Sequence, residues 1–124
     1  MAYSSNYMTI PGLKAYATLA SKQYYVVRIA ATAGYCNVAA AATDPAIGLV
    51  QNDPAAGEVA EIACFGVAKG SASTAITMGA WVASNSTGQL VTTTTSGDEV
   101  VGKALETCTA QNDIIAVLLC QHNY

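Results

Sequence analysis

The stretch that decides the fold is "AWVASNSTGQLVTTTTSGDEVVGKALETC", residues 80–108. Three runs with strand composition, "AWVAS", "QLVTT" and "VVGKALETC", alternate with two polar turn runs, "NSTG" and "SGDE". Gly88 falls in the first turn, where a hairpin favours glycine. The threonines after Val91 continue the second strand, because Thr suits a half-exposed pleated surface. The stretch therefore predicts a hairpin followed by a returning strand.

The same pattern extends over the rest of the chain. The runs "LKAYATLA", "YYVVRIAA", "IGLV", "EVAEIACFGVAK" and "DIIAVLLC" have strand-like length and composition. Turn signals recur at roughly the 8–12-residue spacing of a sandwich or barrel. The run "AGYCNVAAAATDPA", residues 33–46, is expected to be a strand followed by a loop, because its alanines are too few for a helix before Asp44-Pro45. We expect an all-β protein, a small compact β-barrel or β-sandwich of about eight or nine short strands.

The N-terminal residues differ in composition from the strands. They include four large aromatic or apolar side chains after the first two residues: Tyr3, Tyr7, Met8 and Ile10. Residues 4–6 are polar and break any strand or helix period, and Pro11-Gly12 follows as a hinge. Tyr supplies contact area at low entropic cost. We therefore predict an extended N-terminal arm, residues 1–11, that contacts neighbouring protein through these four side chains, and a single β domain, residues 12–124.

Composition indicates a surface that meets other protein. Only 10% of residues are charged, and 55 of the 124 residues are Ala, Gly, Ser or Thr. Low charge is a mark of interface cores. The last strand-like run, residues 114–119, is apolar on both faces, which fits a central strand or a subunit contact. Ile114 and Val117 are therefore predicted contact residues, and we expect a homo-oligomer.

Several classes of partner are disfavoured. The net charge of −3 leaves no basic patch for nucleic acid. No apolar run approaches the ~18 residues of a membrane helix. The start of the sequence does not resemble a secretory signal, and the four cysteines lack a C-x-x-C spacing. We therefore expect synthesis in a reducing cytoplasm.

The residue types needed for catalysis do not come together in the sequence. The single histidine, His122, lies near the end of the chain. Glu58 and Glu61 are three apart, which places them on opposite faces of a strand. Asp98 and Glu99 follow a glycine in a turn, where we expect them to be solvated. The sequence therefore predicts no enzyme, no metal site and no cofactor.

Three segments together resemble a known family. They are "AIGLVQNDPAAGEVAEIACFGVAKG", "ITMGAWVASNSTGQLV" and "VVGKALETCTAQNDIIAVLL", residues 46–70, 76–91 and 100–119. Their order and spacing resemble the capsid cement proteins of tailed bacteriophages, which decorate and stabilise the head. Residues 1–45 depart from the family pattern, with a Tyr-rich start and two added apolar runs.

The resemblance carries its own expectations. It implies a compact β-barrel or sandwich without catalysis or cofactor. It also implies binding to the assembled lattice of the major capsid protein, as a homo-oligomer and most often a trimer. The protein would then be found in the virion, on the outer surface of the capsid, after synthesis in the host cytoplasm.

A second function remains open from the residues alone. A small β-module that binds a glycan or another small ligand would use exposed aromatic side chains. The candidates are Tyr3, Tyr7, Tyr16, Tyr24, Tyr25, Tyr35 and Trp81. A glycan site would gather them on one concave face, whereas a cement protein would spread them over an arm and a subunit contact.

Overall fold

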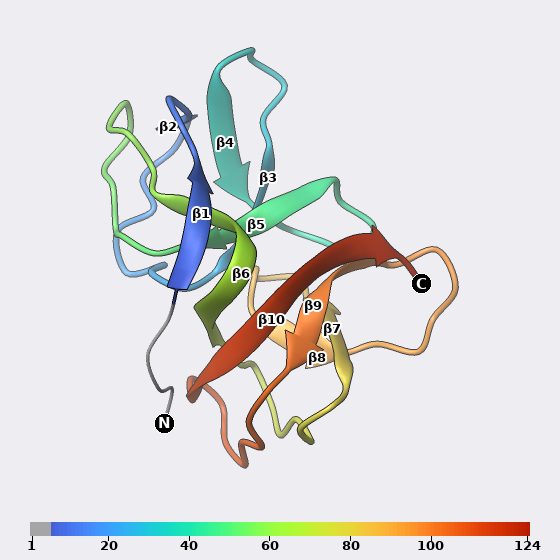
Figure 1. The fold of residues 1–124 in the computed structure, drawn as a ribbon. Coiled ribbons are helices and arrows are strands. Elements are labelled where there is room, and N and C mark those ends of the chain that lie inside the picture. The colour runs from blue at the N-terminus through green and yellow to red at the C-terminus, as the bar shows by residue number, and fades with distance from the viewer. Residues whose placement is uncertain (1–5) are drawn as a thin grey trace.

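The computed structural model describes residues 6–124, which form ten β-strands and no helix (Figure 1). The prediction of an all-β protein is therefore confirmed. The strands are β1 (Asn6–Ile10), β2 (Lys14–Ala15), β3 (Val26–Ile29), β4 (Tyr35–Val38), β5 (Ala46–Val50), β6 (Ile62–Ser71), β7 (Trp81–Ser84), β8 (Leu90–Thr92), β9 (Glu99–Ala104) and β10 (Ile114–Asn123). Strands β2–β10 correspond to runs that the sequence predicts as strands, whereas β1 is formed by residues assigned to the arm.

The strands belong to one mixed sheet. Its order is β2-β4-β3-β5-β6-β10-β9-β7-β8, and β1 pairs with β6 off this path. The β2–β4 pair is parallel, and the other strand pairs are antiparallel. Within residues 6–124 the end strands β2 and β8 do not pair with each other, so the sheet is not closed into a barrel.

The predicted hairpin forms between β7 and β8. Gly88 takes a positive φ of 88° in its turn, and Asn85 Oδ1 accepts the amides of Thr87 and Gln89, each at 2.9 Å. The turn also joins the hairpin to the N-terminal half of the sheet, because the amide of Val26 donates to the carbonyl of Gly88 at 2.7 Å.

The strand that enters the threonine run ends earlier than the sequence predicts. β8 stops at Thr92, and Thr93 is buried. Its hydroxyl donates to Oδ2 of Asp98 at 2.5 Å, and the amide of Tyr124 donates to the carbonyl of Asp98 at 2.9 Å. The expectation that Asp98 is simply solvated is therefore wrong, because a buried hydroxyl requires an acceptor and this carboxylate supplies it.

Two buried clusters form the core. The first is Val26, Ala39, Leu49, Ala63, Ala68, Ala72, Ile76, Val82, Leu90, Val101, Ala104, Cys108, Ile115, Val117 and Leu119. The second is Ala15, Leu19, Val27, Cys36, Val50, Ala60 and Ile62. β6 contributes to both clusters, Ile62 to the second and Ala63 and Ala68 to the first. Figure 1 shows β6 between the two halves, with β1 and β10 on either side of it.

β6 requires a glycine where these partners meet. Gly66 pairs with Tyr7 of β1 and with Leu119 of β10, and its φ is +103°. A Cβ at this position would lie 2.4 Å from the carbonyl oxygen of Asn6. The backbone of β1 therefore approaches β6 more closely than any side chain at Gly66 would allow.

We expect Gly66→Ala to lower the free energy of unfolding by about 3 kcal/mol, from left-handed strain plus a backbone clash with β1. The matched control is Gly57→Ala, since Gly57 has a φ of +84° but nothing within 4 Å of the added Cβ. That control should cost about 1 kcal/mol, from strain alone. Urea unfolding of the two variants checks this, and equal losses would contradict the close approach of β1.

Candidate docking surface

One cross-strand row defines a face of the sheet. Its successive Cα partners, from β1 through β6, β10 and β9 to β7, are Asn6, Val67, Leu118, Lys103 and Trp81. Residues directly opposite one another in antiparallel strands project to the same side. Met8 and Phe65 are partners in the next such pair of β1 and β6. We call these seven residues the outer face.

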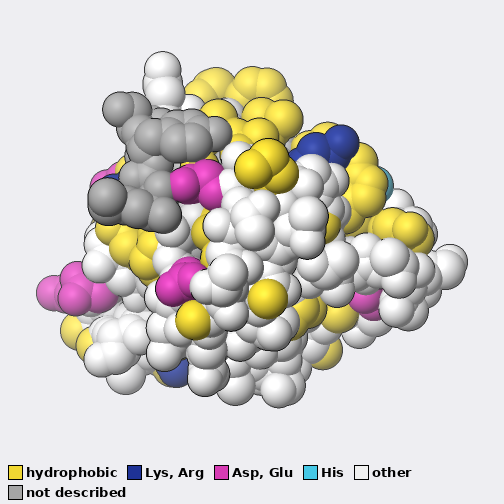
Figure 2. Space-filling view, turned by 90° about the horizontal axis from the view of Figure 1, so that it is seen from below, with side chains coloured by type: hydrophobic (Ala, Val, Ile, Leu, Met, Phe, Trp, Pro, Cys, Tyr) yellow, Lys and Arg dark blue, Asp and Glu magenta, His cyan; other side chains and the backbone are white. Residues whose placement is uncertain are grey.

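The outer face is apolar and exposed. Met8 and Phe65 are each 65% exposed, and Leu118 is 42% exposed. Figure 2 shows hydrophobic side chains gathered along the upper edge of the molecule, with a basic side chain beside them. Clustered exposure of large apolar groups marks interaction surfaces, whereas scattered single exposures are ordinary.

Strand alternation explains why these groups point outward. In β6 the buried positions Ala68 and Gly70 face the core, whereas Phe65 is 65% exposed and Val67 is half-buried on the other side. Gly70 has no room for a side chain, because a Cβ there would lie 2.5 Å from Cδ1 of a core leucine. In this half of β6 the large residues Phe65 and Val67 therefore have space only on the side away from the core.

The apolar row ends at an aromatic–cation group. Lys103 Nζ lies 4.4 Å from the centroid of the Trp81 ring. The ring of His122 contacts Trp81 edge-on, with centroids 4.8 Å apart at an interplanar angle of 82°. The Trp81 ring is therefore held between two neighbours from other strands.

The predicted arm residues are placed differently from one another. Tyr3 lies outside the described residues. Tyr7 and Ile10 are half-buried and pack against the two core clusters, while Met8 faces outward. The Tyr7 hydroxyl donates to Oε2 of Glu61. In this structure residues 6–10 therefore lie on the same chain's β6, and Met8 is their exposed apolar side chain.

The two predicted contact residues of β10 occupy different environments. Val117 is fully buried in the first core cluster, and Ile114 is half-buried at the start of the strand. Val117 has no accessible surface and cannot contact another molecule. In the middle of β10 the exposed side chain is that of its neighbour Leu118. The sequence reasoning missed Leu118 and Phe65, although the small–large alternation in β6 was a usable signal for Phe65.

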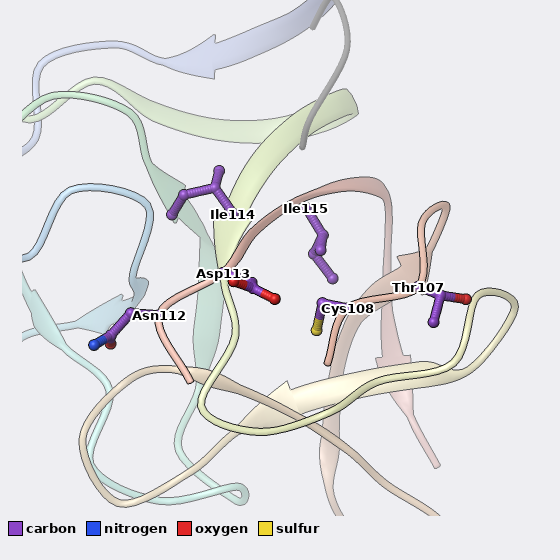
Figure 3. Close-up of a pocket in the computed structure, with 6 residues that line it drawn as sticks. All are labelled: Thr107, Cys108, Asn112, Asp113, Ile114 and Ile115. Carbon is purple, nitrogen blue, oxygen red and sulfur yellow. The ribbon is translucent and has the colours of Figure 1, made fainter. Parts of the chain in front are cut away.

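A pocket of about 360 Å³ lies at the β9–β10 turn (Figure 3). It is lined by Thr107, Cys108, Asn112, Asp113, Ile114 and Ile115. Oδ2 of Asp113 already accepts the amides of Thr109 and Ala110, at 3.3 and 3.2 Å. Asn112 Oδ1 and Thr107 Oγ1 likewise accept from Gln89 Nε2 and the Met78 amide, at 2.7 and 3.0 Å. The polar side chains of this pocket are therefore engaged within the protein, and no aromatic ring lines it.

The aromatic side chains form separate groups. Tyr16 and Tyr35 contact each other edge-on at 5.9 Å. Tyr24 and Tyr25 each lie near a lysine, at 5.9 and 5.4 Å from its Nζ, and Trp81 lies on the outer face. In the part of the chain that the structure describes, no ring contact joins one group to another, so they do not form the single cluster that a glycan site requires.

The titratable groups offer little chemistry. Cys36, Cys64, Cys108 and Cys120 are free thiols, and burial raises the pKa of Cys36. Cys120 Sγ lies 3.9 Å from Nδ1 of His122. Among residues 6–124 no group of three or more His, Cys, Asp or Glu side chains is arranged to hold a metal ion. The same residues contain no helix long and apolar enough to cross a membrane.

The all-β fold and the exposed sheet face together define a small protein suited to contact with other protein. A family model described as phage cement protein matches residues 9–119, and the chain belongs to this family. The fold is similar to that of the head fibre gp8.5 N base of bacteriophage phi29, with a TM-score of 0.68 and 14% identity over 98% of both chains. No curated protein matches the chain. The family resemblance read from the sequence is thus confirmed.

Tyr7 should ionise late. Burial, the hydrogen bond to Glu61 and the nearby negative charge of Glu61 raise its pKa from 10.0 to about 12. Because the folded pKa lies above the ordinary value, the stabilising contribution of the neutral hydroxyl is complete below pH 10 and is lost as the pH rises through about 12. Phenolate absorbance should show a late-ionising tyrosine, and Tyr7→Phe should remove that phase. A late phase that persists in the variant would show that Tyr7 is solvated.

Proposed function

We propose that this chain is a structural capsid cement protein that binds the outer surface of the assembled phage head and stabilises it. Membership of the phage cement family over residues 9–119 supports this role. The observation that carries it is the exposed apolar outer face, centred on Met8, Phe65 and Leu118. The partner is the lattice of the major capsid protein, and the place of action is the exterior of the virion.

The physical design suits this role. The outer face lies on hydrogen-bonded strands, so binding does not have to order a loop, and little conformational entropy is lost. Each copy buries only a small apolar patch and binds modestly. A capsid shell presents many equivalent binding sites. Many bound copies together bridge the joints between capsomers, and this multivalency stabilises the shell.

The finer features of the proposal follow from composition and from the family. We propose a homo-oligomer, a trimer, made in the host cytoplasm, with no catalytic role, cofactor, nucleic-acid partner or membrane partner. The low charge of 10% supports self-association. Within residues 1–11, Tyr3 and Met8 are proposed as contacts to the capsid, with Met8 presented on β1, which is paired with β6. Tyr7, Ile10 and Ile114 are left as subunit contacts at the margins of the domain.

Met8→Ser should weaken binding to expanded, empty capsids of the phage that encodes the chain, because it removes an exposed apolar group from the outer face. We expect about a fivefold loss, on the scale of one partly buried side chain. Co-sedimentation over a range of protein concentrations measures the loss.

The control is Met78→Ser, a matched change outside the outer face, because Met78 is 60% exposed and Met8 is 65% exposed. Met78→Ser should bind as the unmodified protein does. An equal loss of capsid binding in both variants, or no loss in Met8→Ser, would show that the outer face does not bind the capsid. Light scattering of the unmodified protein tests the trimer separately.

A further inference from the structure

Lys103 is the one charged residue in the cross-strand row of the outer face. The other four members of the row are Asn6, Val67, Leu118 and Trp81. Lys103 is half-buried, and within the described residues it makes no ion pair. An ammonium group on an apolar interface is costly to cover unless the partner provides a negative group.

The ammonium group is also held in place. It lies 4.4 Å from the Trp81 ring centroid, closer than the two other lysines that lie over tyrosine rings, at 5.4 and 5.9 Å. His122 contacts the same ring and restricts its rotation. A lysine positioned in this way loses less rotamer freedom when it binds an anion, and its N–H groups remain available as donors.

We propose that Lys103 and Trp81 form a carboxylate-recognition point on the outer face. The face then docks a protein segment that presents an Asp or Glu side chain flanked by aliphatic residues. The aliphatic groups cover Phe65 and Leu118, and the carboxylate binds Lys103. This inference rests on the proposed function, because it assigns the segment to the major capsid protein.

Charge favours protein over nucleic acid as the occupant. A phosphate backbone is bound by several cations along a groove. Here the row holds one lysine with three apolar side chains and Asn6, and Lys69 is the one other cation on that side of β6, on a chain whose net charge is −3. One carboxylate beside aliphatic side chains matches that arrangement, and an extended polyanion does not.

The test is Lys103→Gln in co-sedimentation with expanded, empty capsids at two salt concentrations. We expect about tenfold weaker binding, the scale of one hydrogen bond to a charged group. The salt dependence of binding should fall as well, because an ion pair has been removed. Lys103→Arg keeps the charge and should restore both affinity and salt dependence.

The matched control is Lys22→Gln. It removes the same charge from another lysine that lies over an aromatic ring, that of Tyr25. Lys22→Gln should bind as the unmodified protein does. The emission of Trp81, the single tryptophan, should also change when the unmodified protein binds capsids.

The outcomes separate the two claims. If the unmodified protein does not co-sediment with capsids, the proposed function fails. If it binds and Lys103→Gln binds equally well, or loses affinity with an unchanged salt dependence, the carboxylate point is wrong and the function stands. If Lys103→Gln instead alters the oligomeric state of the free protein, a second copy occupies the face, which also overturns the inference.

Discussion

The structure depends on one strand, β6, which is shared by three partners. One of its edges pairs first with β5, at Ile62 and Ala63, and then with β10, from Gly66 to Ser71. The opposite edge pairs with β1. Because β5 and β10 follow each other along one edge, the two halves of the sheet and their two cores are joined through β6. Gly66 makes the pairing with β1 sterically possible, since a Cβ at this position would meet the β1 backbone.

The same constraint produces the docking surface. Close packing of the first core cluster against β6 requires small inward residues, and the strand supplies Ala68 and Gly70 there. Phe65 and Val67 then project outward, beside Leu118 of β10 and Met8 of β1. The apolar surface is thus a consequence of how the core is filled. This favours the proposed capsid contact, because a face that is part of a hydrogen-bonded sheet does not need to be ordered on binding.

Much of the fold was predictable from local patterns. Turn residues and β-branched runs predicted β2–β10 and the hairpin at Gly88, because turn chemistry and strand composition act over a few residues. The docking surface was predicted only in part. Met8 was predicted and is exposed, whereas Val117 was chosen on a strand apolar on both faces and lies in the core. Phe65 and Leu118 were missed. Whether an apolar side chain points to the core or to solvent depends on which side of its strand the rest of the protein packs against.

The sequence by itself determined the all-β class, the family and the absence of a recognisable catalytic motif, since these depend on composition, turns and the order of segments. Tertiary structure alone decided the rest. It paired β1 with β6, and it set Lys103 over Trp81 in one row with Leu118. These relations join residues far apart in the chain or settle which strand lies beside which. Strand order and register fix them, and no local pattern in a single sequence encodes either one.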